Sequence, residues 1–195
     1  MNLCTLERIK ALIKIDADST EYDAVLNALI EAVSQAAENY MNRNVENTTY
    51  TEYKSVYPGE YLFSLKAYPV TSITSIYNDT TWQWASGSSV STTYVNSDGD
   101  SGLLFFDTSS LVAGYNALKV TYVGGMATCT EELLDNYADL AHAAERQVAF
   151  LYKTRTKIGA QSVNAVNGGV TWETGVVWLR DVKKVLDMYR RHCSG

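Results

Sequence analysis

The chain has 195 residues, of which 46% are hydrophobic and 19% are charged, and its formal net charge is −6. This composition excludes an intrinsically disordered protein, and the length predicts one domain or one domain with an appendage. No apolar run approaches the roughly 18 residues of a membrane-spanning helix, and residues 1–4 lack the basic start of a secretory signal. We therefore expect a protein with no membrane partner that folds in the cytoplasm.

The first 43 residues predict a short helix, an acidic turn over residues 16–20 and a long amphipathic helix. Asp18 or Ser19 is expected to cap the free N–H groups at the start of the long helix. Apolar side chains of the long helix recur at steps of three and four residues and so share one face. These residues are Tyr22, Val25, Leu26, Leu29, Val33, Ala36, Ala37 and Tyr40.

The next segment, residues 48–127, is rich in Thr, Tyr, Val and Ser, which favour β-strands. Turn-forming residues separate short candidate strands, and this spacing predicts an antiparallel meander or a small barrel-like sheet. The predicted strands are Thr49–Val56, Tyr61–Leu65, Ile73–Asn78, Thr81–Trp84, Thr92–Val95, Leu103–Phe106 and Ala117–Val123.

Helical periodicity returns from Thr130 to about Tyr152 and again from Trp178 to Tyr189, with a polar connector over residues 154–175. The connector is long enough to let the last helix reach away from the body. The predicted class is α+β: two N-terminal helices, a third long helix and a C-terminal helix form a helical bundle with an inserted antiparallel β-rich subdomain. The predicted bounds are 1–47 with 128–195 for the helical core and 48–127 for the insert.

Residues for catalysis are sparse. His142 lies among alanines in the third helix, where helix–helix packing is expected, and His192 lies near the C-terminal end. No nucleophile elbow, Walker loop or dinucleotide fingerprint follows a predicted strand. Cys4, Cys129 and Cys193 form no metal or disulfide pattern and indicate reduced thiols. We expect a non-enzymatic protein without a cofactor, and a hydrolase with an unrecognised site is the weakest alternative.

One segment has the spacing of a calcium loop. Asn96, Asp98 and Asp100, with Asp107 further on, place oxygen atoms where calcium ligands are needed. Position six of that loop, however, holds Ser101 where glycine is required. A hairpin turn made of turn-favouring residues explains the same pattern and is the preferred interpretation.

Two further sets of residues are candidates for binding. Trp82 and Trp84 alternate in a predicted strand and, with Tyr94, are candidate interface aromatics. The same aromatic surface is also compatible with a carbohydrate- or ligand-binding module. Residues 146–195 carry nine basic and three acidic groups, which suits docking on an acidic partner. The docking candidates are Arg180, Lys183, Lys184, Arg190 and Arg191.

The helix layout and several segments resemble the head-tail connector proteins of long-tailed bacteriophages, also called head-completion or adaptor proteins. Tyr68-Pro69-Val70 and the residues up to Tyr77 look like the opening of that family's β-rich insert. Leu118–Gly125 resembles its last strand and the glycine turn into the third helix. The matching positions in the helices are Leu6, Leu12, Ile15, Leu29, Ala32, Ala36 and Tyr40, and those in the closing segment are Gln147, Tyr152, Ile158, Ser162, Leu186 and Tyr189.

This resemblance implies a structural virion protein of the neck, at the head–tail junction, that assembles in the host cytoplasm. Its partners would be copies of itself in a ring (dodecameric in the family), the portal protein, a tail-proximal neck or stopper protein, and double-stranded DNA that passes without sequence recognition. The basic residues of the last helix would dock on the portal. A ring needs a second contact surface, for which the polar stripe with Asn27 and Glu31 is a candidate.

Overall fold

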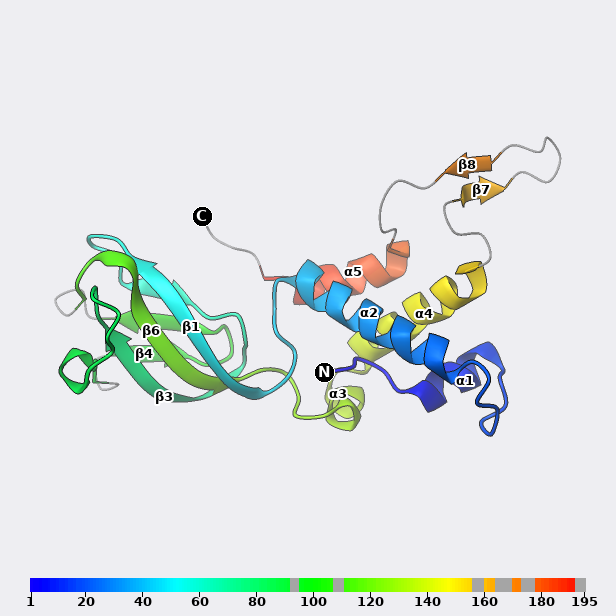
Figure 1. The fold of residues 1–195 in the computed structure, drawn as a ribbon, viewed down its shortest axis with the longest axis horizontal. Helices are drawn as coiled ribbons and strands as arrows, with labels where there is room; N and C mark the ends of the chain where they lie inside the picture. Colours follow the sequence, from blue (N-terminus) through cyan, green and yellow to red (C-terminus); the bar gives the residue numbers. More distant parts are fainter. Residues whose placement is uncertain (92–94, 107–110, 156–159, 164–169, 173–177, 192–195) are drawn as a thin grey trace. The chain divides into compact units, whose positions relative to one another are not determined.

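The computed structural model describes residues 1–91, 95–106, 111–155, 160–163, 170–172 and 178–191. Helices and antiparallel strands are both present, which confirms the predicted α+β class. The chain forms two compact units (Figure 1). One unit contains Met1–Met41 with Thr130–Gly195 and is mainly helical, and the other contains Asn42–Cys129 and is built of strands. That the chain divides into domains at residues 47 and 128 stays a prediction.

The first helix, α1 (Leu6–Ile13), has a defined start and end. The Thr5 hydroxyl accepts a hydrogen bond from the Arg8 N–H at 3.5 Å, as an N-cap residue does. Lys14 ends the helix in the left-handed conformation at φ 62°, and its N–H bonds back to carbonyls of the last turn.

A buried lysine holds the acidic turn that follows α1. Lys10 is 5% exposed, and its ammonium donates to the carbonyl oxygens of Ala17 (3.1 Å) and Ser19 (2.8 Å). It also pairs with the carboxylate of Asp23 at 2.6 Å, so three oxygens surround its three N–H donors. Lys10 therefore ties α1 to the first residue of the next helix.

The long helix, α2 (Asp23–Met41), begins later than its predicted cap requires. Asp18 and Ser19 lie upstream of Asp23, and the Asp18 N–H bonds to the Asp16 carboxylate within the turn. The predicted cap is therefore wrong. Val25, predicted on the packed face, is 46% exposed, because the packed face of α2 is the one that carries Leu26 and Ile30. The buried residues of α2 are Leu26, Ile30, Val33, Ser34, Ala37 and Met41.

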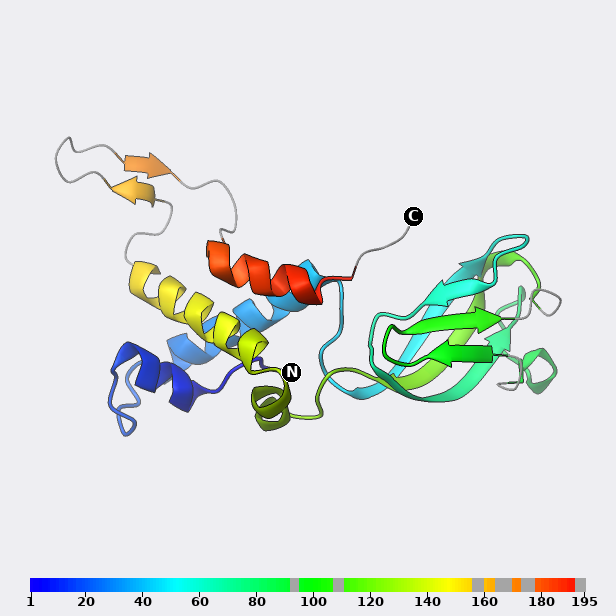
Figure 2. The ribbon, with the colours of Figure 1, turned by 180° about the vertical axis from the view of Figure 1, so that it is seen from behind.

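The predicted third helix is two helices. α3 (Thr130–Asn136) and α4 (Ala138–Thr154) are separated by Tyr137, whose φ of −134° and ψ of 50° lie outside the helical region. α4 is the central helix of its unit and packs against α1, α2, α3 and α5 (Arg180–Tyr189) (Figure 2). Its buried face includes Ala141, Ala143 and Ala144, and these small side chains allow the other helices to approach closely.

The segment predicted as a plain polar connector contains two strands. β7 (Ala160–Val163) and β8 (Val170–Trp172) pair antiparallel, with Ala160 opposite Trp172 and Val163 opposite Val170. The connector prediction missed this pair, because the polar and glycine residues around it carry no alternating pattern.

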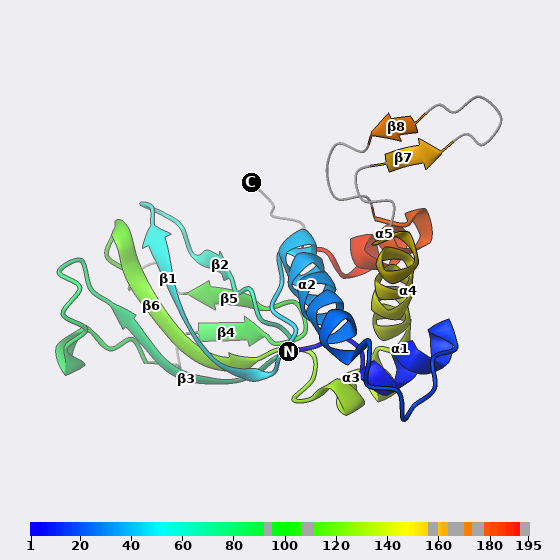
Figure 3. The same ribbon diagram turned by 45° about the vertical axis from the view of Figure 1, so that its right-hand side comes forward.

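The β unit contains two three-stranded antiparallel sheets, with the orders β1-β6-β3 and β2-β5-β4 (Figure 3). The antiparallel prediction is confirmed, but a meander is wrong, since the last strand lies between the first and the third. A short 3-10 helix, Ser86–Ser88, follows β3. The strands are β1 (Thr48–Val56), β2 (Leu62–Ser64), β3 (Val70–Asn78), β4 (Val95–Asp98), β5 (Leu103–Phe106) and β6 (Gly114–Gly124).

A buried polar network joins β1 and β6 to the segment that follows β2. Tyr122 of β6 is 0% exposed, and its hydroxyl accepts from the Ala67 N–H at 3.0 Å and donates to the Glu52 carboxylate of β1. Glu52 also accepts from the Lys66 N–H at 2.8 Å and pairs with Lys54 at 2.7 Å. Burial raises the pKa of the Glu52 carboxyl, but hydrogen bonds from Lys54, Tyr122 and Lys66 outweigh it, so the pKa lies below its ordinary 4.5.

We expect Glu52 to make the stability of the β unit depend on acid. A carboxyl whose pKa is lowered by folding stabilises the fold above its ordinary pKa, and this contribution is lost as the pH falls through the lowered value. Glu52→Gln should cost about 1–3 kcal/mol at neutral pH and remove that part of the acid dependence. Urea unfolding followed by the amide NMR signals of β6, from about pH 3 to pH 7, measures both effects. An unchanged acid dependence in the variant would contradict the assignment.

Candidate interaction surfaces

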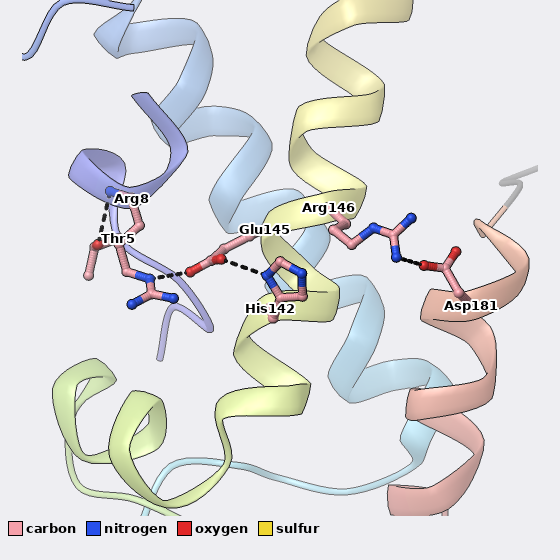
Figure 4. Close-up of polar contacts among 6 residues, drawn as sticks. All are labelled: Thr5, Arg8, His142, Glu145, Arg146 and Asp181. Atoms are coloured by element: carbon pink, nitrogen blue, oxygen red, sulfur yellow. Dashed lines mark hydrogen bonds and ion pairs between the residues drawn. The ribbon is translucent and has the colours of Figure 1, made fainter. Parts of the chain in front are cut away.

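Three consecutive residues of α4 hold the helices on its two sides, and the first two of them, Glu145 and Arg146, are drawn in Figure 4. Glu145, which is 3% exposed, forms an ion pair with Arg8 of α1. Arg146 pairs with Asp181 in the first turn of α5. The side-chain oxygen of Gln147 accepts from the backbone N–H of the residue just before α5 at 3.1 Å. Successive helical residues point about 100° apart, so neighbouring residues of α4 reach α1 and α5 in different directions.

His142 supplies a second contact to the buried carboxylate. Its Nδ1 lies 3.2 Å from Oε2 of Glu145, and its side chain is 56% exposed (Figure 4). The predicted role of His142 in packing between helices is therefore wrong. The imidazole lies at the surface and contacts a charge that would be costly to bury without partners.

The last helix lies on the helical unit. Val182 and Leu186 of α5 are each 1% exposed, and α5 packs against α2 and α4. The Tyr189 hydroxyl donates to the Asp139 carboxylate at 2.8 Å, so the end of α5 meets the start of α4. The expectation that this helix reaches away from the body is therefore wrong.

Two of the predicted docking residues lie beside α2. The Lys183 nitrogen is 6.0 Å from the centre of the Tyr40 ring, and the Arg190 guanidinium is 5.2 Å from it. The Tyr40 hydroxyl donates to the Asp187 carboxylate at 2.5 Å, and Lys183 pairs with the same carboxylate at 3.7 Å. The hydrogen bond from Tyr40, together with the two cations, lowers the pKa of the Asp187 carboxyl. These cations therefore have contacts within their own unit.

The remaining docking candidates differ from these. The backbone N–H of Arg191 donates to the Met41 carbonyl at 2.9 Å. Arg180 and Lys184 are exposed, and neither forms an ion pair with any described residue. Met188, one turn beyond Lys184, is 74% exposed. Portal docking by the predicted basic residues stays a prediction.

A polar groove of about 380 Å³ lies along α2, beside residues 1–2. Ser34 is buried next to it, with its hydroxyl accepting from the Leu3 N–H (3.0 Å) and donating to the Ile30 carbonyl (2.7 Å). The groove thus follows the helix face that was predicted to be a second interface. Its side chains from α2 are Asn27, Glu31, Ser34, Gln35 and Glu38.

In the β unit, Trp82 and Trp84 lie in a loop, so the predicted strand Thr81–Trp84 is wrong. The Asp79 carboxylate accepts from the N–H groups of Thr81 (2.7 Å) and Trp84 (2.8 Å) and from the Thr81 hydroxyl (2.6 Å). These hydrogen bonds from Thr81 and Trp84 lower the pKa of the Asp79 carboxyl. Both tryptophans have positive φ, 60° and 52°, which an extended strand does not allow.

The two tryptophans have different surroundings. The ring centres of Trp84 and Tyr53 are 5.6 Å apart, and the Lys119 nitrogen lies 5.6 Å from the centre of the Trp84 ring. Trp82 is 56% exposed and donates its indole N–H to a backbone carbonyl of β6 at 3.1 Å. Tyr94 lies outside the described residues. An interface role for these aromatics stays a prediction.

The calcium candidate falls in the hairpin between β4 and β5. Asp98 pairs with Leu103 across the hairpin, and its carboxylate accepts from the Ser101 hydroxyl at 2.6 Å. This is the turn that the preferred interpretation predicted, with Asp100 in it and Asn96 within β4. Asp107 lies outside the described residues, so the calcium prediction stays open. No group of three or more His, Cys, Asp or Glu in the described part of the chain is placed to hold a metal ion.

Two of the three cysteines lie among the described residues. Cys4 is 2% exposed, and burial raises the pKa of its thiol to about 12. Cys129 is exposed, both are free thiols, and Cys193 lies outside the described residues. None of the helices that the structure describes is long and apolar enough to cross a membrane.

The family model for head completion proteins matches residues 2–192. The chain belongs to the head completion protein family. The resemblance seen in the sequence is thereby confirmed. No curated relative matches the chain at a significant level.

Solved structures of gene transfer agent (GTA) particles contain chains with the fold of this family member. A chain from the neck of an empty particle, computed with C6 symmetry, has a TM-score of 0.65 at 16% identity and covers 96% of this chain and 90% of that one. A chain from the neck of the native particle, computed with C12 symmetry, has a TM-score of 0.61 at 15% identity and covers 95% of this chain and 91% of that one. A chain from the virion of the native particle has a TM-score of 0.61 at 16% identity and covers 92% of this chain and 84% of that one. At such identities the likeness shows a shared fold, which extends over nearly the whole chain.

Sequence reasoning missed Glu145, although a signal was present. Position 145 falls on the apolar face of its helix with Ala141, Val148 and Tyr152, all buried. A charged residue on such a face needs a partner. The sequence did not reveal that the partner is Arg8, 137 positions away.

Removing Arg8 should destabilise the helical unit of this head completion protein. In Arg8→Ala the Glu145 side chain, 4% exposed, keeps only His142, and we expect a loss of about 2–4 kcal/mol. Adding Glu145→Gln should recover part of this loss, because a neutral amide needs no counter-charge. Urea unfolding followed by far-ultraviolet circular dichroism measures the difference. The control Arg180→Ala should change stability by less than about 0.5 kcal/mol. An Arg8→Ala variant as stable as the parent contradicts the assignment.

Proposed function

We propose that the chain is a structural neck subunit that forms a ring between the portal and the tail of a phage or phage-like particle. The observation that carries this proposal is family membership over residues 2–192. The fold shared with chains from GTA necks of C6 and C12 symmetry supports a ring, since cyclic symmetry repeats one subunit around an axis. Such a subunit acts by its shape and contacts, without catalysis.

The ring extends the channel through which DNA passes. Residues 1–49 carry a net charge of −4, and an acidic channel surface would repel the phosphate backbone, so that DNA slides without sequence recognition. The partners are further copies of the chain, the portal on one side and a tail-proximal neck or stopper protein on the other. Assembly takes place in the host cytoplasm, and the final location is the virion neck.

The carbohydrate- or ligand-binding alternative gains no support. It required Trp82 and Trp84 to present one aromatic surface from a strand. In the structure they lie in a loop with different neighbours, and Trp84 packs on Tyr53.

Deleting the gene for this chain from the genome that encodes the particle tests the proposal. We expect heads that package DNA but do not join tails, with infectivity restored when the chain is supplied from a plasmid. Cryo-electron microscopy of the restored particles should show density for the chain in the neck, and a tailless control strain separates neck density from tail density. Tailed, infectious particles without the chain would contradict the proposal.

A further inference from the structure

We propose that, in the ring, the outer face of α5 of one copy docks into the α2 groove of the next copy. The outer face consists of Arg180, Lys184 and Met188, and the groove carries Glu31 among its polar side chains. This inference rests on the proposed ring function and names the two surfaces that form its repeated contact. The occupant of the groove is therefore a second copy of this chain.

The outer face of α5 is built for contact. Arg180, Lys184 and Met188 follow one another at four-residue steps and so lie on one side of the helix, away from buried Val182 and Leu186. All three are exposed, and the two cations form no ion pair with described residues. A flexible methionine next to two long basic side chains can adapt to an irregular surface.

The groove has the opposite chemistry. Ammonium and guanidinium groups only donate hydrogen bonds, whereas the Glu31 carboxylate and the side-chain oxygens of Asn27 and Gln35 accept them. Exposed Ala28 and Ala32 lie beside Glu31 and Gln35 on the same helix, and their small side chains allow a second helix to approach. The groove thus offers acceptors for the two cations and an uncharged strip for the methionine.

The two surfaces lie on opposite sides of α2. Tyr40 contacts α5, with its hydroxyl on Asp187 and its ring 6.1 Å from Trp178. Glu31 is nine residues before Tyr40, which is about two and a half turns, so the two side chains point in opposite directions. Copies that join α5 of one to the groove of the next therefore continue head to tail. Such an arrangement closes into a ring when the rotation from one copy to the next divides a full turn evenly.

Charge also disfavours the contact of two identical surfaces. Two α5 faces would bring Arg180 and Lys184 of one copy against the same cations of another, which like-charge repulsion opposes. The same argument applies to two grooves with Glu31. An acidic portal is the competing occupant for the α5 face, and the experiment below separates the two.

Cross-linking in assembled particles tests the contact. The chain is supplied with Cys129→Ser and Cys193→Ser, plus Lys184→Cys and Glu31→Cys, and purified particles are treated with a short bismaleimide. We expect a ladder of multimers of the chain, which neither single cysteine variant gives. Lys153→Cys with Glu31→Cys is the matched control, since Lys153 is an exposed lysine of α4, and it should give no ladder.

The outcomes separate this inference from the proposed function. Particles that contain the chain but link Lys184→Cys only to another protein, such as the portal, overturn the inference and leave the neck function intact. Particles assembled with the unaltered chain that lack it in their necks overturn both. A ladder that depends on both cysteines supports the head-to-tail contact.

Exchanging the charges gives an independent test. Arg180→Glu with Lys184→Glu, and separately Asn27→Lys with Glu31→Lys, should each lower the yield of tailed particles about tenfold or more. Expressing both variants together should restore the yield, because each altered surface then meets its opposite. Lys153→Glu, a matched change on α4, should have no effect. If both variants fold by circular dichroism and their mixture does not restore assembly, the inference is wrong.

Discussion

The ion pair between Arg8 and the buried Glu145 joins α1 to α4, the central helix of its unit. Helices as short as α1 and α5, with 8 and 10 residues, are marginal in water on their own. Both are held by α4, which reaches α1 through Glu145 and α5 through Arg146 and Gln147. The surface that α5 presents is therefore a consequence of how α4 is built.

The β unit solves a similar problem in its own core. Its first and last strands are far apart in sequence, and the Glu52 carboxylate joins them by accepting from Tyr122 and from the backbone after β2. In each unit a mostly buried carboxylate contacts segments that are distant along the chain. Such groups define which segments must meet, since an unmatched partner would leave a desolvated charge.

Local patterns predicted the elements well where burial sets the pattern. Periodicity located α2, α4 and α5, and β-propensity located β5 to the residue. The strand prediction failed where a side chain competes for backbone hydrogen bonds. The Asp79 carboxylate accepts from the N–H groups of Thr81 and Trp84, so this segment forms a loop despite its strand-like residues. The sheet order and the pairing of Glu145 with Arg8 depend on contacts between distant residues, which no local pattern encodes. The groove was only partly foreseen, through Asn27 and Glu31.

The distribution of charge along the chain fits a head-to-tail assembly. Residues 146–195 carry +6, whereas residues 1–145 carry −12. A uniform negative charge would make all copies repel one another, but a basic outer face of α5 and a polar groove with Glu31 on the other side of α2 favour contacts in a single direction. A head-to-tail contact leaves one surface of each kind unoccupied in a dimer. Further copies can therefore add until the ring closes. In the contact proposed above, the basic C-terminal segment is the part of an acidic protein that joins one copy to the next.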